Sequence, residues 1–210
     1  MICIAPTKPL IHPVASKKEI RDVQKFRYQI LVEELGFDTL PGIDHRRRLL
    51  GDRLDDQLPL FAAYAGGRLV GTIRWGLVSW MTQPPLAVRR ALAAGYGEGY
   101  HRAQIGICDR LAVAADHRGV WLNLELSTAA CRSLVQNGCS ACFCWARPRL
   151  CRLYQRLGFR DLGIVADGEA DQVRRVMRLE TSDQEHLKKI GSPFLEIFGI
   201  ASNSDTCMRQ

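Results

Sequence analysis

A strand, a turn and a helix are predicted in the stretch LAVAADHRGVWLNLELS, residues 111–127. Arg118 and Gly119 form the turn, and apolar residues recur at helical spacing after it. Free N–H groups at a helix start, beside a glycine and an arginine, favour a bound anion such as a phosphate. Trp121 and Asn123 stand where small residues usually let the backbone close around a phosphate. The stretch therefore predicts an anion site, and leaves open whether it still holds a phosphate.

A second candidate group is an arginine on the inner face of the first predicted helix. Ser16 and Glu19 form a capping-box pattern, and the helix is expected to run from there to about Leu35. Arg27 lies within the apolar stripe of this helix. A charge at such a position extends to solvent, pairs inside the core or faces a binding site, and the sequence leaves these alternatives open.

The hydrophobic pattern predicts the scaffold that positions these groups. A β-hairpin is expected over residues 59–75, because Gly66 and Gly67 separate two apolar runs, whereas residues 36–57 are polar and loop-like. The other expected elements are strands over 11–16, 105–113, 139–146, 159–165 and 172–180, and helices over 84–95 and 147–157. This order indicates an α/β fold with a mixed, mostly antiparallel central sheet flanked by helices.

Composition limits the class of protein. The chain has 210 residues, 47% of them hydrophobic, which suits a single domain with a core over about residues 11–180 and a helix and tail over 181–210. No apolar run approaches the roughly 18 residues of a membrane span, and the N-terminus lacks a signal-peptide pattern, so a cytoplasmic protein is expected. The net charge is +7, with basic runs at 45–48 and 147–156. Aromatic residues do not interleave with these runs, so no nucleic acid partner is expected.

Three of the eight cysteines form the pattern C-x2-C-x-C at Cys139, Cys142 and Cys144. The surrounding CSACFCWA is typical of a buried strand, on which Cys142 and Cys144 share one face. No histidine lies nearby to complete a tetrahedral set of ligands. We therefore expect core thiols in a reducing compartment, and no metal site.

Two motifs, in this order and spacing, resemble the GNAT acyltransferase superfamily. The first is LAVAADHRG, which matches the family's phosphate loop after a strand, and the second is Tyr154, Gly158 and Phe159 in LYQRLGF. The first half of the chain is similar to the autoinducer synthases and the related N-acyl amino acid synthases. The matching positions there are Arg27, Glu33 or Glu34, Gly36, Phe37, the pair Asp52 and Asp55, Arg74 and Arg110.

Three departures from these families bear on the donor. Ile107 stands where the synthases have a glutamate, although Asp109 is close by, and Arg147 stands where many acetyltransferases have an asparagine. About 30 residues separate Arg74 from the next strand, and such an insertion could help to enclose a long acyl chain. The phosphate loop lacks two small residues, which a single pantetheine phosphate tolerates better than the CoA pyrophosphate does.

The resemblance implies acyl transfer from a thioester donor to an amine, with no permanently bound cofactor. The donor is acyl carrier protein, through its phosphopantetheine, or acyl-CoA. The residues expected to contact it are Leu111, Ala112, Val113, Arg118, Gly119 and Asn123. Tyr154 is expected to protonate the departing thiolate, because phenols and thiols have pKa values of similar size. The alternative for Tyr154 is an aromatic core residue.

The base that deprotonates the attacking amine is open among Asp109, Glu33, Glu34, His117 and a chain of water molecules. On the acceptor side, arginine forks match carboxylates. The residues expected to bind the acceptor are Arg27, Phe37, Asp52, Asp55, Arg74 and Arg110. A salt-bridge network of purely structural importance is the alternative for the charged members.

The sequence therefore predicts an N-acyltransferase that moves a long-chain acyl group to the amine of a small acceptor. An amino acid is the preferred candidate for this acceptor. Acidic acyl carrier protein is the expected transient partner of the basic residues at 46–48 or 147–156. Two alternatives remain. One is a short-chain acetyl-CoA N-acetyltransferase, and the other is a non-catalytic domain that binds acyl groups or acyl carrier protein.

Overall fold

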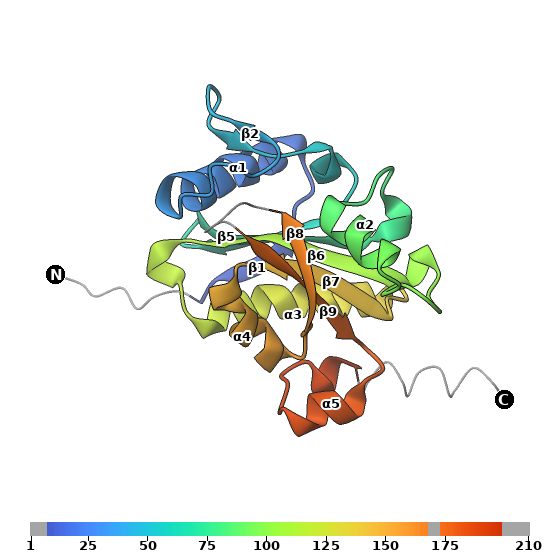
Figure 1. The fold of residues 1–210 in the computed structure, drawn as a ribbon. Helices are drawn as coiled ribbons and strands as arrows, with labels where there is room; N and C mark the ends of the chain where they lie inside the picture. Colours follow the sequence, from blue (N-terminus) through green and yellow to red (C-terminus); the bar gives the residue numbers. More distant parts are fainter. Residues whose placement is uncertain (1–7, 168–172, 199–210) are drawn as a thin grey trace. The chain divides into compact units, whose positions relative to one another are not determined.

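The structure, a computed structural model, describes residues 8–167 and 173–198. Seven strands form a sheet in the order β1-β4-β5-β6-β7-β9-β8, and helices flank it (Figure 1). Because only β6 and β7 pair in parallel among the described registers, the mixed, mostly antiparallel α/β fold predicted from the sequence is confirmed. The chain divides into two compact units: unit 1 is Met1–Arg74 with Arg110–Ala130, and unit 2 is Trp75–Asp109 with Cys131–Gln210.

Unit 1 holds the first half of the predicted scaffold. Its strands are β1 (Leu10–Pro13), β2 (Ile43–Asp44), β3 (Leu49–Leu50), β4 (Leu60–Ala65), β5 (Arg68–Leu77) as far as Arg74, and β6 (Ile105–Val113) from Arg110. Its helices are α1 (Lys17–Arg27), η1 (Tyr28–Glu34), η2 (Arg53–Asp56), η5 (Ala115–His117) and α3 (Val120–Gln136) as far as Ala130. The stretch 36–57, expected to be loop, thus contains the short β2–β3 hairpin and the 3-10 turn η2.

The first helix begins as predicted but does not remain α-helical. The Glu19 N–H donates to the Ser16 hydroxyl at 3.2 Å and the Glu19 carboxylate accepts from the Ser16 N–H at 2.9 Å, so the capping box is confirmed. The α-helix ends at Arg27 and continues as the π-helix η1. The helix thus ends at Glu34, close to the predicted Leu35, but its second half is a π-helix, which the sequence pattern did not indicate. Segments of π-helix often mark functional sites.

Helices α1 and α3 cover opposite faces of the β4–β5 hairpin (Figure 1). Val23 of α1 packs on Leu60 and Ala62. On the other face a Cβ at Gly71 would lie 2.9 Å from a Leu126 methyl carbon of α3, so the glycine allows the helix to approach closely. The turn of this hairpin is formed by the two predicted glycines, both with positive φ, as a two-residue turn requires.

Unit 2 holds the second half of the sheet. Its strands are the start of β6, then β7 (Ala141–Ala146), β8 (Arg160–Asp167), β9 (Arg174–Glu180) and the end of β5. Its helices are η3 (Val78–Trp80), α2 (Leu86–Ala93), η4 (Arg102–Gln104), the end of α3, α4 (Pro148–Leu157) and α5 (Gln184–Lys189). Every element predicted in this half is present, with bounds shifted by a few residues.

In unit 2, strand β7 extends beyond its pairing with β6. Strands β6 and β7 pair from Ile105 with Ala141 to Ile107 with Phe143, and β7 then continues to Ala146 paired only with β9 in this unit. Helix α4 contacts β7, β8 and β9, and α2 contacts β8 and β9. In Figure 1 the two helices lie on opposite sides of these strands.

The insertion that contains α2 is attached to the edge strand β8 by side chains. One guanidinium nitrogen of Arg90 donates to the carbonyls of Val165 and Ala166, at 2.8 and 3.1 Å. The Tyr96 hydroxyl donates to the Leu162 carbonyl at 3.3 Å. These bonds satisfy carbonyls along an irregular stretch of the β8–β9 ladder. None of the helices within the described residues is both long and apolar enough to cross a bilayer.

Candidate active site

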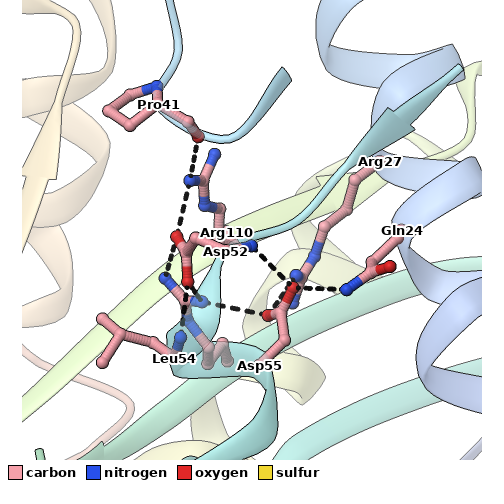
Figure 2. Close-up of polar contacts among 8 residues, drawn as sticks. Gln24, Arg27, Pro41, Asp52, Leu54, Asp55 and Arg110 are labelled. Carbon is pink, nitrogen blue, oxygen red and sulfur yellow. Dashed lines mark hydrogen bonds and ion pairs between the residues drawn. The ribbon is translucent and has the colours of Figure 1, made fainter. Parts of the chain in front are cut away.

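Three arginines and two aspartates of unit 1 form one polar cluster (Figure 2). The Arg27 Nη1 lies 2.7 Å from Asp55 Oδ1, and the Arg74 Nη1 lies 3.0 Å from the same oxygen. The same Arg74 nitrogen lies 2.6 Å from Asp52 Oδ1. These contacts bring together four of the five charged residues that the sequence assigned to acceptor binding. The fifth is Arg110.

Arg110 completes the cluster from strand β6. Its Nη2 donates to Asp52 Oδ2 at 2.9 Å and to the backbone carbonyl of Pro41 at 2.7 Å (Figure 2). Arg110 has a φ of +55°, in the left-handed region that non-glycine residues rarely adopt. Arg48 is the other non-glycine residue of the described chain with positive φ. A strained backbone in mid-strand indicates that the surrounding contacts hold Arg110 in place.

The acidic pair is shaped by its own local sequence. Asp52 caps η2, because its carboxylate accepts from the Leu54 N–H at 2.9 Å, and Asp55 accepts in return from the Asp52 N–H at 3.4 Å. The Asp-x-x-Asp spacing is thus a capping box that turns both carboxylates towards the arginines. Gln24, which donates to Asp55 at 3.2 Å, was missed by the sequence analysis. Its position three residues before Arg27 on the same helix face was the available signal.

The cluster has a buried part and an edge nearer to solvent. The side chains of Arg27, Arg74 and Asp55 are at most 1% exposed, whereas Arg110 is 9% and Asp52 23% exposed. Three guanidinium groups face two carboxylates, so the formal charge of the cluster is +1. The Nε and Nη2 of Arg27 have no hydrogen-bond partner within the described part of the chain. The cluster therefore has an unsatisfied cationic character, which favours an additional anion.

The arginines also determine the ionisation of the two carboxyl groups. Burial raises the pKa of Asp52, but the hydrogen bond and charge of Arg74, together with the charge of Arg110, outweigh burial and hold the pKa well below its usual range. The pKa of Asp55 is lowered in the same way, with burial opposed by Arg27 and Arg74. Both groups are therefore carboxylates at neutral pH, and neither can serve as a proton donor there.

The predicted donor loop is also in unit 1, and its arginine already has partners. Arg118 forms an ion pair with Glu34 of η1, and its Nε donates to the Val113 carbonyl at 3.1 Å. Asn123 donates its side-chain N–H to the Gly119 carbonyl at 2.9 Å. Gly119 has no positive φ, and a Cβ there would meet no atom within 4 Å among the described residues that are not its chain neighbours. The fold itself therefore does not require a glycine at this position.

The flanking residues of this loop form a second charged group. Asp116 of η5 pairs with Arg68, and His117 Nδ1 lies 3.0 Å from Asp116 Oδ1. Trp121 is exposed, and the Lys8 ammonium lies 5.4 Å from the centre of its ring. Of the expected donor contacts on β6, Ala112 and Val113 are buried and Leu111 is half-buried.

The expected proton donor lies in unit 2. Tyr154 is half-buried on α4, and its ring packs edge-on against Phe159 at 5.6 Å. Burial, reinforced by the neighbouring thiols of Cys144 and Cys108, raises the pKa of Tyr154 above its ordinary value, so the phenol keeps its proton at neutral pH. Its hydroxyl makes no hydrogen bond to another described residue. The phenol is therefore a protonated group that is free to donate.

The remaining expected site residues lie on β6, after η1 and at the end of η1. Asp109 is buried on β6, in unit 2. Phe37 is half-buried after η1, and its N–H donates to the Leu31 carbonyl at 2.9 Å. Glu34, a candidate base, is engaged with Arg118, and Glu33 is paired with Arg48.

The cysteine motif consists of buried thiols. Cys142 and Cys144 lie on β7, whereas Cys139 precedes the strand. The Cys142 sulfur lies 3.8 Å from that of Cys108, and burial raises the pKa of Cys139 to about 12. Six free cysteines are described, and no group of three or more potential ligands among the described residues is arranged to hold a metal ion.

Solved structures of acyl-transferring synthases share this fold. FeeM, an N-acyl amino acid synthase from uncultured soil microbes, gives a TM-score of 0.67 at 18% identity, with 89% of this chain and 98% of FeeM covered. BjaI, a CoA-dependent acyl-homoserine lactone synthase, gives 0.65 at 23% identity, with 93% and 99% covered. The acyl-homoserine lactone synthase LasI gives 0.63 at 17% identity, with 82% and 90% covered.

The family comparison is more specific than the fold. Residues 38–169, more than half of the chain, match the family described as N-acyl amino acid synthase FeeM. No curated protein matches this chain by sequence similarity. The matched range contains the acidic pair, two of the three cluster arginines, the donor loop and Tyr154. The resemblance predicted from the motifs is confirmed: the chain belongs to the FeeM family of N-acyl amino acid synthases and is an N-acyltransferase.

Proposed function

We propose that this N-acyltransferase moves a long-chain acyl group from acyl carrier protein to the amino group of an amino acid. The family match over residues 38–169 is the observation that carries the proposal. A cytoplasmic location, where thiols stay reduced, suits the six free cysteines and the proposed donor.

The acceptor follows from the charge of the arginine–aspartate cluster. Arg27 and Arg74 are committed to Asp55 inside the protein, whereas Arg110 and Asp52 form the edge nearer to solvent. A cluster with a formal charge of +1 attracts the carboxylate of an amino acid, and the Arg110 guanidinium is the donor best placed to bind it. The residues Arg27, Arg74, Asp52 and Asp55 then hold Arg110 in position.

The chemistry needs one base and one acid. The neutral amine attacks the thioester carbonyl carbon, the tetrahedral intermediate collapses, and the C–S bond breaks while the C–N bond remains. We assign the proton given to the departing thiolate to Tyr154, because a phenol is protonated at neutral pH. Because Glu34 is engaged with Arg118, Asp109 is the preferred candidate to take the proton from the amine.

The outer face of α4 supports acyl carrier protein as the donor. Arg149, Arg152 and Arg156 are exposed at i, i+3 and i+7, the helix contains no acidic residue, and no described residue pairs with any of the three. An acidic carrier protein complements such a face. Acyl-CoA is the second candidate donor, because BjaI, which shares the fold, is CoA-dependent.

The test compares donors and acceptors in one turnover assay. Acyl carrier protein and CoA, each loaded with acetyl and with long-chain acyl groups, are offered with amino acids and with the matching decarboxylated amines. We expect long-chain acyl carrier protein to be the best donor, and amino acids to exceed their amines by about ten-fold or more in kcat/KM, the size of a charged hydrogen bond. Transfer from acetyl-CoA alone would instead identify a short-chain acetyltransferase. Binding without turnover would identify a non-catalytic binding domain.

A further inference from the structure

The arginine of the donor loop is neutralised by a carboxylate from a distant part of the chain. Glu34, the last residue of η1, pairs with Arg118, and the two positions are 84 residues apart in the sequence. The side chains are 32% and 37% exposed, so the pair is accessible to a ligand from solvent. The Nε of Arg118 is held by the Val113 carbonyl on the strand that leads into the loop.

The loop as a whole has little net positive charge. Arg118 is balanced by Glu34, and Arg68 is balanced by Asp116. Asp116 precedes Arg118 by two residues, so two carboxylates lie on the elements that would face a donor phosphate. A phosphate site normally presents an excess of donors and cations. Here the single side-chain cation of the turn is shared with an acid.

The two possible donors differ greatly in charge. Phosphopantetheine on a carrier protein has one phosphodiester with a single negative charge, whereas CoA has a diphosphate and a 3′-phosphate, with roughly four negative charges in total. A fixed carboxylate within a Debye length repels the second donor more strongly than the first. Rejection of an unwanted ligand by a like charge is a common basis of specificity.

We propose that Glu34 determines donor specificity: its carboxylate disfavours CoA and thereby favours the phosphopantetheine of acyl carrier protein. This inference rests on the proposed acyl transfer and deepens it. Glu34 acts through Arg118 and through its own charge, and takes no proton from the amine.

The experiment measures kcat/KM of the full chain for the same long-chain acyl group on CoA and on acyl carrier protein. Glu34→Gln should raise the ratio of kcat/KM for acyl-CoA to kcat/KM for acyl carrier protein about five-fold. Glu34→Asp keeps the charge and should therefore show the wild-type ratio. Free CoA should bind Glu34→Gln more tightly by a similar factor in calorimetry. Added salt should reduce the difference between wild type and Glu34→Gln.

Asp22→Asn is the matched control, because Asp22 is a surface carboxylate of unit 1 paired with Lys18, and the net charge changes equally. It should leave the donor ratio unchanged. An unchanged ratio in Glu34→Gln, or weaker binding of CoA, would overturn the proposal. A similar loss of kcat with both donors would assign Glu34 as the base instead. If the wild-type protein transferred no acyl group from either donor, the proposed function would fail, while calorimetry with free CoA would still test the role of Glu34.

Discussion

Arg110 reaches Asp52 from a left-handed backbone conformation in the middle of a strand. The Nη2 of Arg110 lies 2.9 Å from Asp52 Oδ2, and its φ is +55°. A non-glycine residue in this region costs about 1–3 kcal/mol, so the contacts of its side chain must offset the strain. This contact joins β6 to the loop that precedes the β4–β5 hairpin. It forms the edge of the cluster that lies nearer to solvent.

Strain and side chain at position 110 are separable by mutation. Arg110→Ala and Arg110→Gly both remove the guanidinium, but only glycine adopts a positive φ without penalty. We expect Arg110→Gly to be more stable than Arg110→Ala by about 1 kcal/mol in urea unfolding. In both variants the KM for the amino acid should rise ten-fold or more. Donor binding should be unchanged. Equal stabilities would show that the backbone at Arg110 is not strained.

Removal of Asp55 should destabilise the protein strongly. Asp55 is the shared partner of the two fully buried arginines, Arg27 and Arg74, and loss of one side of a buried ion pair leaves its charge unsatisfied. We expect Asp55→Asn to lower the free energy of unfolding by about 3 kcal/mol. The neighbouring Asp56 is exposed, and Asp56→Asn should change it by less than about 0.5 kcal/mol.

Acid should weaken the fold through the same aspartates. Their pKa values are lower in the folded chain than the roughly 3.9 of an unfolded aspartate, so the unfolded state binds protons first as pH falls. The stabilisation is complete above about pH 5 and should decline steadily below it. Urea midpoints measured from pH 6 to pH 3 check this expectation. Asp52→Asn, which lacks one of the two groups, should show a shallower decline than the wild-type protein.

The proton donated to the thiolate should depend on Tyr154. Tyr154→Phe keeps the ring contact with Phe159 and removes only the hydroxyl, so the fold should be retained. We expect kcat to fall by about 100-fold or more, the usual contribution of a general acid, with little change in donor affinity. Tyr96→Phe removes a phenol of the same unit that donates to a backbone carbonyl, and should leave kcat within about two-fold. Normal turnover in Tyr154→Phe would show that Tyr154 is an aromatic core residue and not the proton donor.

The basic face of α4 should matter for the carrier protein and not for CoA. Replacement of Arg149, Arg152 and Arg156 by Gln should raise KM for acyl carrier protein by about ten-fold at low salt, with a smaller effect as salt increases. The KM for acyl-CoA should change by less than about two-fold. A triple variant of other exposed arginines, Arg21→Gln, Arg89→Gln and Arg132→Gln, carries the same change in charge and serves as the control. Equal effects of the two triple variants would contradict a docking face on α4.

Local features of the fold could be predicted because neighbouring residues determine them. Two such features are the capping box of Ser16 and Glu19 and the turn at Gly66 and Gly67. In each, the residues involved are at most three positions apart in the sequence. Strand β6 was predicted with its observed bounds, because apolar residues lie on both sides of Asp109 and Arg110. Local sequence did not separate α1 from η1, since the seven residues of η1 are too few to show a different apolar period.

The sequence alone therefore determined most of the longer elements, the fold class and the candidate residues, through local preferences and motif spacing. Tertiary structure decided which charges pair. Arg27 meets Asp55 across 28 residues and Arg118 meets Glu34 across 84, and no local rule selects one acid from 22. Folding also decided the pKa of Asp52, through the charges of Arg74 and Arg110, and that of Tyr154, through burial, because a pKa depends on solvent and on charges brought near. The sequence supplied Glu34 as a candidate base, and the fold places it on the arginine of the donor loop.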